Sequence, residues 1–293
     1  MACPERREEM GPVPLGGRVP VPATGAISLA PGVYGVCAVC HGPAAAGHRV
    51  CWSCHVVGAQ LGGQPAPVVP VFLFALGSPV HRALVGYKAG VTPAGRAART
   101  QSLATVLAEF LAAHSACLLS CSPRPRPALV VPVPSSIGGR PSWHGRHPVA
   151  SLCEQALDLS PEAAPDLEIA EILRAGARPP ARLDARVGGY DVDRLVDVRG
   201  RSAVVLDDVL TSGSRALSAA AALSAAGVRV TAVVALGRLV RPDHNVATAR
   251  FWSDQSDEPF DPSRCTRCAT DPVSRPVVAW RRQQVTISER LVA

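Results

Sequence analysis

The sequence predicts an α/β domain built on a parallel sheet and preceded by a small cysteine-rich module. Short β-branched segments alternate with helical ones, which is typical of parallel sheets covered by helices on both faces. One apolar segment, 203–206, runs into two acids and a Thr-Ser-Gly-Ser loop that opens an alanine-rich helix. Two Cys-x2-Cys pairs lie close together near the N-terminus.

Composition bounds the class of protein. The chain has 293 residues, of which 47% are hydrophobic, and no apolar run reaches the roughly 18 residues of a membrane span. Residues 1–10 are charged and lack the apolar region of a secretory signal, so we expect a cytoplasmic protein. The net charge of +7 is spread along the chain, and leaves open both an ordinary solvated surface and an anionic partner.

The N-terminal part divides into a tail and a cysteine module. Residues 1–33 are rich in Pro and Gly and predict a flexible tail. Residues 34–60 hold a C-x2-C-x10-C-x2-C arrangement formed by Cys37, Cys40, Cys51 and Cys54. In a reducing cytosol such pairs indicate a metal site rather than disulfides, and four thiolates suit a structural Zn²⁺ in a zinc ribbon. Redox dithiols remain an alternative, as does haem, because His41 and His55 each follow a cysteine pair.

Residues 68–241 predict the α/β domain. Apolar and β-branched runs predict strands at 68–76, 128–133 and 228–236, and apolar periodicity predicts helices at 93–114, 148–157 and 216–226. Segment 167–173 is ambiguous between strand and helix, and 175–193 predicts loop with some helix.

The central segment, 201–215, predicts a phosphate site. A buried strand delivers Asp207 and Asp208 to its carboxyl end, and Thr211, Ser212, Gly213 and Ser214 follow as a loop at a helix N-terminus. Backbone N–H groups and the helix dipole favour a phosphate there, and a glycine lets the backbone approach it closely. The carboxylates suit ribose hydroxyls or a hydrated Mg²⁺. The segment therefore predicts a site for a phosphorylated, metal-bound sugar.

A second loop is expected at the same edge of the sheet. The strand at 128–133 ends in Pro132, Val133, Pro134, Ser135 and Ser136. Ligands of parallel sheets bind at the carboxyl ends of the strands, so we expect this loop and 207–214 to face one ligand.

Segment 203–214 resembles the binding motif for phosphoribosyl pyrophosphate (PRPP) of type I phosphoribosyltransferases. The matching residues are Asp207, Asp208, Val209, Thr211, Ser212 and Gly213. Arg215 stands where that family has a hydroxyl for the 5′-phosphate, and arginine can bind phosphate bidentately. The resemblance implies a phosphoribosyltransferase-like fold.

The order of segments is similar to that of the ComF competence-protein family. A four-cysteine module, a Tyr/Lys segment at Lys88, the Pro132–Pro134 loop and the PRPP motif follow one another in that order. The resemblance implies pyrophosphate binding by Pro132 to Ser136 with Arg140, and it implies that Lys88 is a further PRPP or phosphate ligand. The family's Arg-Gly-Phe-Asn-Gln segment is poorly kept, with only Gly145 in common, and Pro180 stands where its later glutamine is expected.

These resemblances imply two functions. The first is PRPP binding with Mg²⁺, with transfer of phosphoribosyl to an unidentified nitrogen acceptor. Asp207 and Asp208 are then the catalytic residues, which hold the ribose hydroxyls and the waters of Mg²⁺. The second is a non-catalytic ComF-type protein of DNA uptake in transformation, which binds single-stranded DNA or a partner protein, or acts as a regulator.

Residues 242–293 extend beyond the resemblance. Cys265-x2-Cys268 is either half of a second metal site, with His244 as a third ligand, or two free thiols. Phe251, Trp252 and Phe260 predict anchors that pack this extension onto the domain.

Overall fold

The chain forms a mixed α/β structure around one six-stranded, mostly parallel sheet. The computed structural model describes residues 26–27, 35–89, 92–119, 126–134, 147–161, 166–193, 195–256 and 260–268. The strands in spatial order are β1 (Ala26–Ile27), β2 (Val68–Ala75), β8 (Arg229–Val240), β7 (Ser202–Leu210), β3 (Ala128–Pro132) and β4 (Leu167–Ile169). Every neighbouring pair is parallel except β1 with β2. A separate antiparallel pair consists of β5 (Leu173–Ala175) and β6 (Tyr190–Val192).

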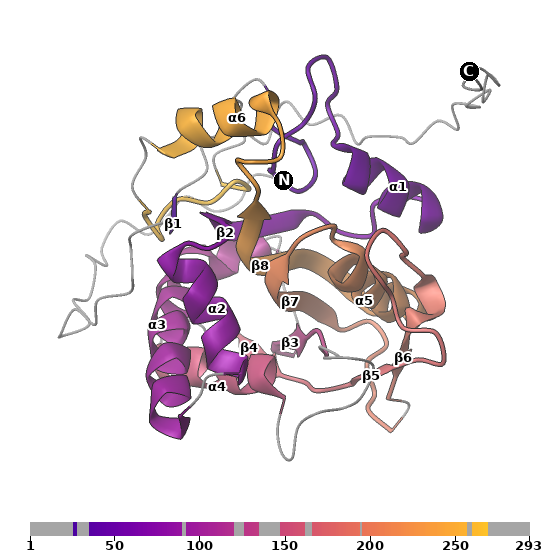
Figure 1. Cartoon of the computed structure of the whole chain (residues 1–293). Helices are drawn as coiled ribbons and strands as arrows, with labels where there is room; N and C mark the ends of the chain where they lie inside the picture. The colour runs from indigo at the N-terminus through magenta and orange to yellow at the C-terminus, as the bar shows by residue number, and fades with distance from the viewer. Residues whose placement is uncertain are drawn as a thin grey trace.

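Helices cover both faces of the sheet (Figure 1). On one face lie α2 (Pro79–Ala89), α3 (Pro93–Leu118) and α4 (Pro148–Asp158). The opposite face is covered by α5 (Ser214–Ala225) and by the cysteine module with its helix α1 (Trp52–Gln60). The remaining elements are a 3₁₀ turn at Val187–Gly189 and α6 (Val246–Ser256). The predicted parallel sheet with two covered faces is confirmed.

Strand β7 is buried on both sides because its side chains alternate between two cores. Val204 and Leu206 pack toward α2, α3 and α4, whereas Ala203 and Val205 pack toward α5. This period of two is a property of any extended strand. The alanines of α5 are buried almost throughout, and their small side chains let the helix lie close to the sheet.

Most predicted elements are present with shifted ends. The helix predicted at 93–114 continues to Leu118, and the strand predicted at 228–236 continues to Val240. The ambiguous segment 167–173 contains the whole of β4 and the first residue of β5, and these two strands belong to different sheets.

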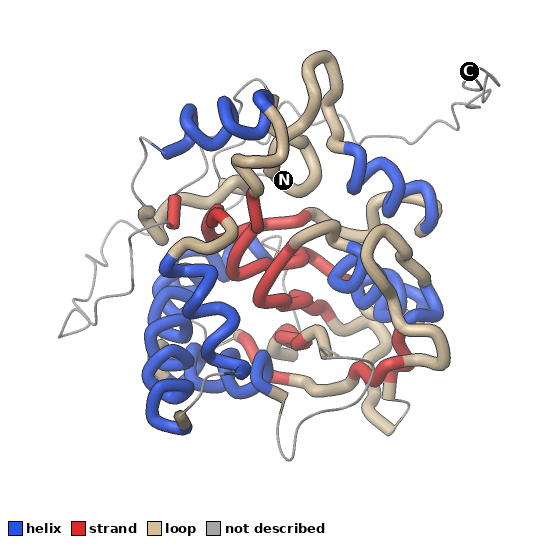
Figure 2. Tube along the Cα trace, viewed as in Figure 1, coloured by secondary structure: helices blue, strands red, loops and turns tan. Residues whose placement is uncertain are grey.

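The cysteine module differs from a β ribbon. Its first half is mostly loop, with one strand-like bridge between Val36 and Pro43, and its second cysteine pair opens helix α1 (Figure 2). Within the segment predicted as a flexible tail, Ala26–Ile27 pairs with β2 as β1, and the rest of that tail lies outside the described residues.

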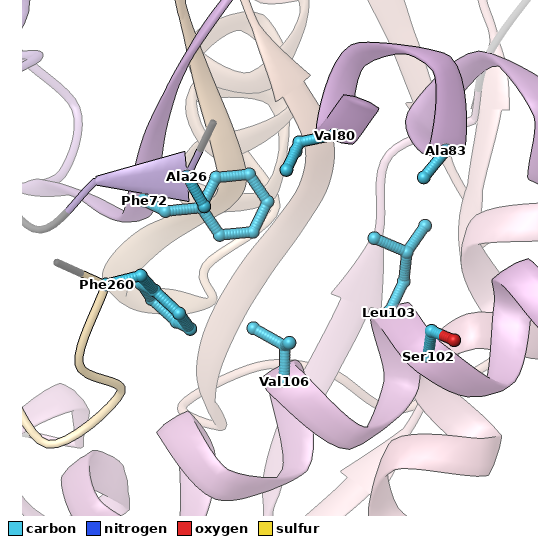
Figure 3. A pocket seen from close by; sticks show the side chains of 8 residues that line it. All are labelled: Ala26, Phe72, Val80, Ala83, Ser102, Leu103, Val106 and Phe260. Carbon is cyan, nitrogen blue, oxygen red and sulfur yellow. The ribbon is translucent and has the colours of Figure 1, made fainter. Parts of the chain in front are cut away.

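The C-terminal extension packs onto the domain as predicted. Phe251 is buried against Leu73 and Val240, with Trp252 half-buried beside it. The Phe260 ring meets the Phe72 ring edge-on, with centroids 5.7 Å apart (Figure 3). The pocket in Figure 3 has a volume of about 10 Å³, which is room for a single water, so it is a packing gap. Among the described residues, no helix combines the length and apolar character needed to cross a membrane.

Candidate functional site

The sheet has a point at which neighbouring connections leave in opposite directions. Strands β3 and β7 are adjacent, yet the helix after β3 (α4) lies on one face and the helix after β7 (α5) lies on the other. The loops that leave these two strands therefore diverge, and such switch points are where open α/β sheets bind ligands. The Val133 N–H donates to the Leu206 carbonyl over 2.8 Å, so the two predicted loops begin side by side.

The Thr-Ser-Gly-Ser loop forms the N-terminus of α5. Gly213 is the N-cap residue and has φ +82°, a left-handed conformation that glycine adopts without steric cost. The hydroxyls of Ser212 and Ser214 are 3.0 Å apart, and the Ser214 N–H points at Ser212 Oγ over 3.4 Å. The loop thus gathers hydroxyls and backbone donors at the positive end of a 12-residue helix.

This loop lines a cavity of about 280 Å³. The cavity lies between the end of β7 with the start of α5 on one side and the segment Pro180–Arg182 on the other. Its lining residues are Pro180, Ala181, Arg182, Asp207, Val209, Leu210, Thr211, Ser212, Gly213, Ser214 and Arg215. The structure therefore brings the predicted phosphate-binding residues and one of the two acids to one hollow.

Asp208 is sealed on the face that carries α2. Its carboxylate accepts a hydrogen bond from the Tyr87 hydroxyl at 2.8 Å and pairs with the Lys88 ammonium at 2.6 Å. Its exposed fraction is 0%. Burial would raise the pKa of Asp208, but the charge of Lys88 and these hydrogen bonds outweigh it and lower that pKa. Lys88, predicted as a phosphate ligand, is thus placed on Asp208.

Asp207 points the other way and lines the cavity. Burial is the main cause that raises the pKa of Asp207 to about 6, against the opposing charge of Arg215. The Asp208 N–H donates to Asp207 Oδ1 over 3.1 Å. The two acids therefore differ. Asp208 has a lowered pKa and is held as an anion in a buried ion pair, whereas Asp207 has a raised pKa and lines the cavity.

Two arginines give the cavity positive charge. The charge of Asp207 raises the pKa of the Arg215 guanidinium, which stands where the resembling family has a hydroxyl. Arg182, on the opposite wall, is exposed. Sequence reasoning missed Arg182, because its place in the wall depends on how segment 180–182 folds back over α5.

The predicted pyrophosphate loop is described only in part. Pro132 and Val133 are buried at the end of β3, and Pro134 is half-buried. Ser135, Ser136, Arg140 and Gly145 lie outside the described residues. The structure thus places the beginning of this loop at the switch point.

The four cysteines of the N-terminal module converge. All four sulfur atoms lie within 4.8 Å of one another, and Cys40 Sγ is 3.7 Å from Cys51 Sγ. Sulfur atoms around a tetrahedral zinc are about 3.8 Å apart, given Zn–S bonds of about 2.3 Å. Backbone N–H groups of Val39 and Cys51 donate to Cys37 Sγ over 3.4 and 3.3 Å. The cluster can hold a metal ion such as zinc.

Arg238 of β8 connects this module to Leu210, which lines the cavity. Its guanidinium donates to the carbonyls of Leu210 and Leu239 over 3.2 and 2.7 Å. Burial would lower the pKa of Arg238, but the nearby Cys40 sulfur raises it. A Cβ on Gly42 would lie 2.8 Å from a guanidinium nitrogen of Arg238, so the module's first turn fits directly against this charge. No sequence pattern marked Arg238, since the partners of this residue come from distant segments.

No protein-family model matches the chain, and neither does any curated protein. The assignment of a function therefore rests on the geometry of the crevice and of the cysteine module.

Proposed function

We propose that the chain binds PRPP, or a related ribose 5-phosphate, with Mg²⁺ in the cavity at the carboxyl end of β7, next to the end of β3. The observation that supports this most strongly is the cavity of about 280 Å³ that joins the N-terminus of α5 to a buried acid. An anion site next to a carboxylate is the combination that a phosphorylated sugar requires.

The 5′-phosphate is assigned to the loop Thr211–Arg215. Hydroxyls of Ser212 and Ser214 and backbone N–H groups of the first turn of α5 would donate to it. Arg215 and Arg182 add charge from two walls of the cavity, and a guanidinium binds phosphate through paired hydrogen bonds. This arrangement offsets the loss of the hydroxyl that Arg215 replaces.

Asp207 is assigned to the ribose hydroxyls and to the waters of Mg²⁺, which is bound through few protein ligands. Mg²⁺ would neutralise charge on the pyrophosphate when bound. Asp208 holds the floor of the site through Lys88 and Tyr87. Its second oxygen, Oδ1, is buried with no hydrogen-bond partner among the described residues, so Tyr87 and Lys88 supply the polar contacts of this carboxylate.

If the site is catalytic, the reaction is phosphoribosyl transfer. A nitrogen nucleophile forms a bond to C1 of the ribose while the C1–O bond to pyrophosphate breaks through an oxocarbenium-like transition state. Pyrophosphate would lie at Pro132 to Ser136, near Arg140. The protein would act by positioning and by electrostatic stabilisation, and the acceptor amine is not identified by the described residues.

In the cysteine module we propose a structural Zn²⁺ held by Cys37, Cys40, Cys51 and Cys54. So short a segment cannot build a core of its own, and metal binding would supply its folding free energy.

Calorimetric titration of the purified protein with PRPP, with and without Mg²⁺, tests the proposal. We expect micromolar, Mg²⁺-dependent binding that weakens at least about tenfold, or about 1.4 kcal/mol, in Asp207→Asn. Asp254→Asn, on the exposed surface of α6, is the matched control and should bind as the parent does. Absence of binding by the parent protein, or equal binding by Asp207→Asn, would contradict the proposal.

One observation favours the second candidate, a non-catalytic ComF-type protein that binds single-stranded DNA or a partner. Trp52 is 71% exposed on the cysteine module, and its ring stacks with that of His55 at 6.1 Å. Exposed aromatic rings are stacking platforms for bases. Binding of a labelled oligonucleotide that falls steeply with salt and is weakened in Trp52→Ala would support this function. Salt-insensitive or absent binding would count against it.

A further inference from the structure

A second group of metal-ligating side chains lies on the opposite side of the sheet from the cysteine module. His114 and Cys117 come from the last turns of α3, and Cys265 and Cys268 come from the C-terminal segment. Cys265 follows Cys117 by 148 positions in the chain. One ligand atom from each of the four lies within 4.8 Å of the other three. The sulfur atoms of the N-terminal cluster lie within the same limit, so both groups are compact enough to share one ion.

We propose that His114, Cys117, Cys265 and Cys268 form a second structural Zn²⁺ site that fastens the C-terminal segment to α3. Cys117 Sγ is 4.0 Å from Cys265 Sγ, and Cys268 Sγ is 3.4 Å from His114 Nδ1. These distances are close to the edges of a tetrahedron with Zn–S bonds of about 2.3 Å and a Zn–N bond of about 2.0 Å. Three cysteines and one histidine are an ordinary donor set for structural zinc.

The backbone around Cys265 repeats a feature of the first cluster. The Arg267 N–H donates to Cys265 Sγ over 3.4 Å, and in the N-terminal module the Val39 N–H donates to Cys37 Sγ over the same distance. In both cases the donor lies two residues after the first cysteine of a Cys-x2-Cys pair. Such bonds stabilise sulfur as a thiolate, the form that binds metal.

The ring of His114 is oriented for coordination. His114 Nε2 lies 3.1 Å from the Pro262 carbonyl oxygen, which can only accept a hydrogen bond. The ring therefore carries its proton on Nε2, and Nδ1 presents a lone pair toward the three sulfur atoms. Metal-bound histidines commonly donate their second nitrogen to a backbone carbonyl in this way.

The surroundings hold the C-terminal segment in place for this role. Arg267 donates to the carbonyls of Leu118 and Thr231 over 3.3 and 2.7 Å, and Phe260 covers Phe72 (Figure 3). His244, expected from the sequence as a third ligand, is exposed in a turn, and the structure groups His114 and Cys117 with the pair instead. A Cys117–Cys265 disulfide would require a sulfur separation of about 2.05 Å and would leave the placement of His114 and Cys268 unexplained.

The metal content of the full chain, purified under reducing conditions, tests the proposal. We expect about two zinc ions per chain by mass spectrometry of the metal, falling to about one in Cys268→Ser, the exposed ligand. Cys153→Ala, which removes a core cysteine outside both clusters, is the matched control and should keep two. Zinc X-ray absorption should give a mean of between three and four sulfur neighbours per zinc in the parent protein and about four in Cys268→Ser.

Two results would overturn the proposal. One is a single zinc per chain in the parent protein, a measurement that does not depend on whether any variant folds. The other is two zinc ions per chain in Cys268→Ser together with sulfur neighbours unchanged from the parent. As a second readout, we expect trypsin to cleave at Arg264 and Arg267 at least about tenfold faster in Cys268→Ser than in Cys153→Ala. Equal cleavage rates would show that the segment is not fastened by this group.

Discussion

The two faces of the sheet treat the neighbouring acids of β7 in opposite ways. On the α2 face, Asp208 is closed in by Lys88 and Tyr87 and is 0% exposed. On the α5 face, Asp207 lines a cavity together with the Thr-Ser-Gly-Ser loop, residues 211–214. Burial acts on both carboxyls, yet the pKa of Asp208 is lowered and the pKa of Asp207 is raised to about 6. Local charge partners, more than depth, therefore decide which of the two acids has the lower pKa.

The two acids also differ in what they contact. The closed face anchors the end of β7 to a helix through an ion pair, and on the open face the Asp207 carboxyl, although buried, lines a cavity. Arg238 lies next to this open face and connects the cysteine module to the carbonyl of Leu210 at the end of β7. Single substitutions on each face of the sheet test this difference.

The largest effect is expected on the closed face. Lys88→Met should lower the free energy of unfolding by about 3–5 kcal/mol, because it leaves the buried Asp208 carboxylate without its countercharge. Urea denaturation measures this loss. The double variant Lys88→Met/Asp208→Asn should recover much of it, and a loss below about 1 kcal/mol in the single variant would show that the ion pair is not what anchors β7.

On the open face, replacing the acid should raise the free energy of unfolding rather than lower it. The raised pKa of Asp207, about 6, means that the folded state binds this proton more tightly than the unfolded chain. The carboxyl therefore costs stability progressively as the pH rises from about 4 to 6, and the cost is constant above that. Asp207→Asn should raise the free energy of unfolding by about 2 kcal/mol at pH 8 and by almost nothing near pH 4.

Denaturation of the ligand-free protein at several pH values checks this prediction, with Asp208→Asn as the contrast. Because the pKa of Asp208 is lowered, its ionised form stabilises the fold, so Asp208→Asn should be destabilising at pH 8. Destabilisation by Asp207→Asn at pH 8 would mean that the two faces do not differ as described.

The smallest change in stability is expected where the cysteine module contacts Arg238. Gly42→Ala should cost about 1–2 kcal/mol, since the new methyl group would displace the buried Arg238 guanidinium. Gly188→Ala is a matched control, because a Cβ there meets nothing within 4 Å. Thermal unfolding of the two variants compares them directly, and equal midpoints would show that the contact between the module and Arg238 is loose.

Features encoded in short contiguous segments could be predicted from the sequence. The strand, acid pair, phosphate loop and helix of 203–225 follow one another without interruption, and the four N-terminal cysteines span 37–54. Their convergence follows from spacing alone. The separation of Asp207 from Asp208 also follows in part, because adjacent strand residues point to opposite faces.

Features that depend on distant partners could not be predicted. Arg182, Arg238 and His114 gain their importance from segments far away in the chain, and single residues of these types carry no periodic signal. Lys88 was expected at the phosphate, but the packing of α2 against the sheet directs it to Asp208. The second half of the cysteine module was expected as ribbon, yet helix α1 begins directly after Cys51.

The separation of the second cluster's ligands has a consequence for biosynthesis. Cys117 is translated 148 positions before Cys265, so Cys117 and His114 of α3 meet the other two members of the cluster only after all six strands of the sheet have been synthesised. A nascent chain that stops before residue 260 lacks Phe260 and both late thiols, and leaves Phe72 without its cover. This cluster therefore forms only after the last segment that the structure describes, residues 260–268, has been synthesised.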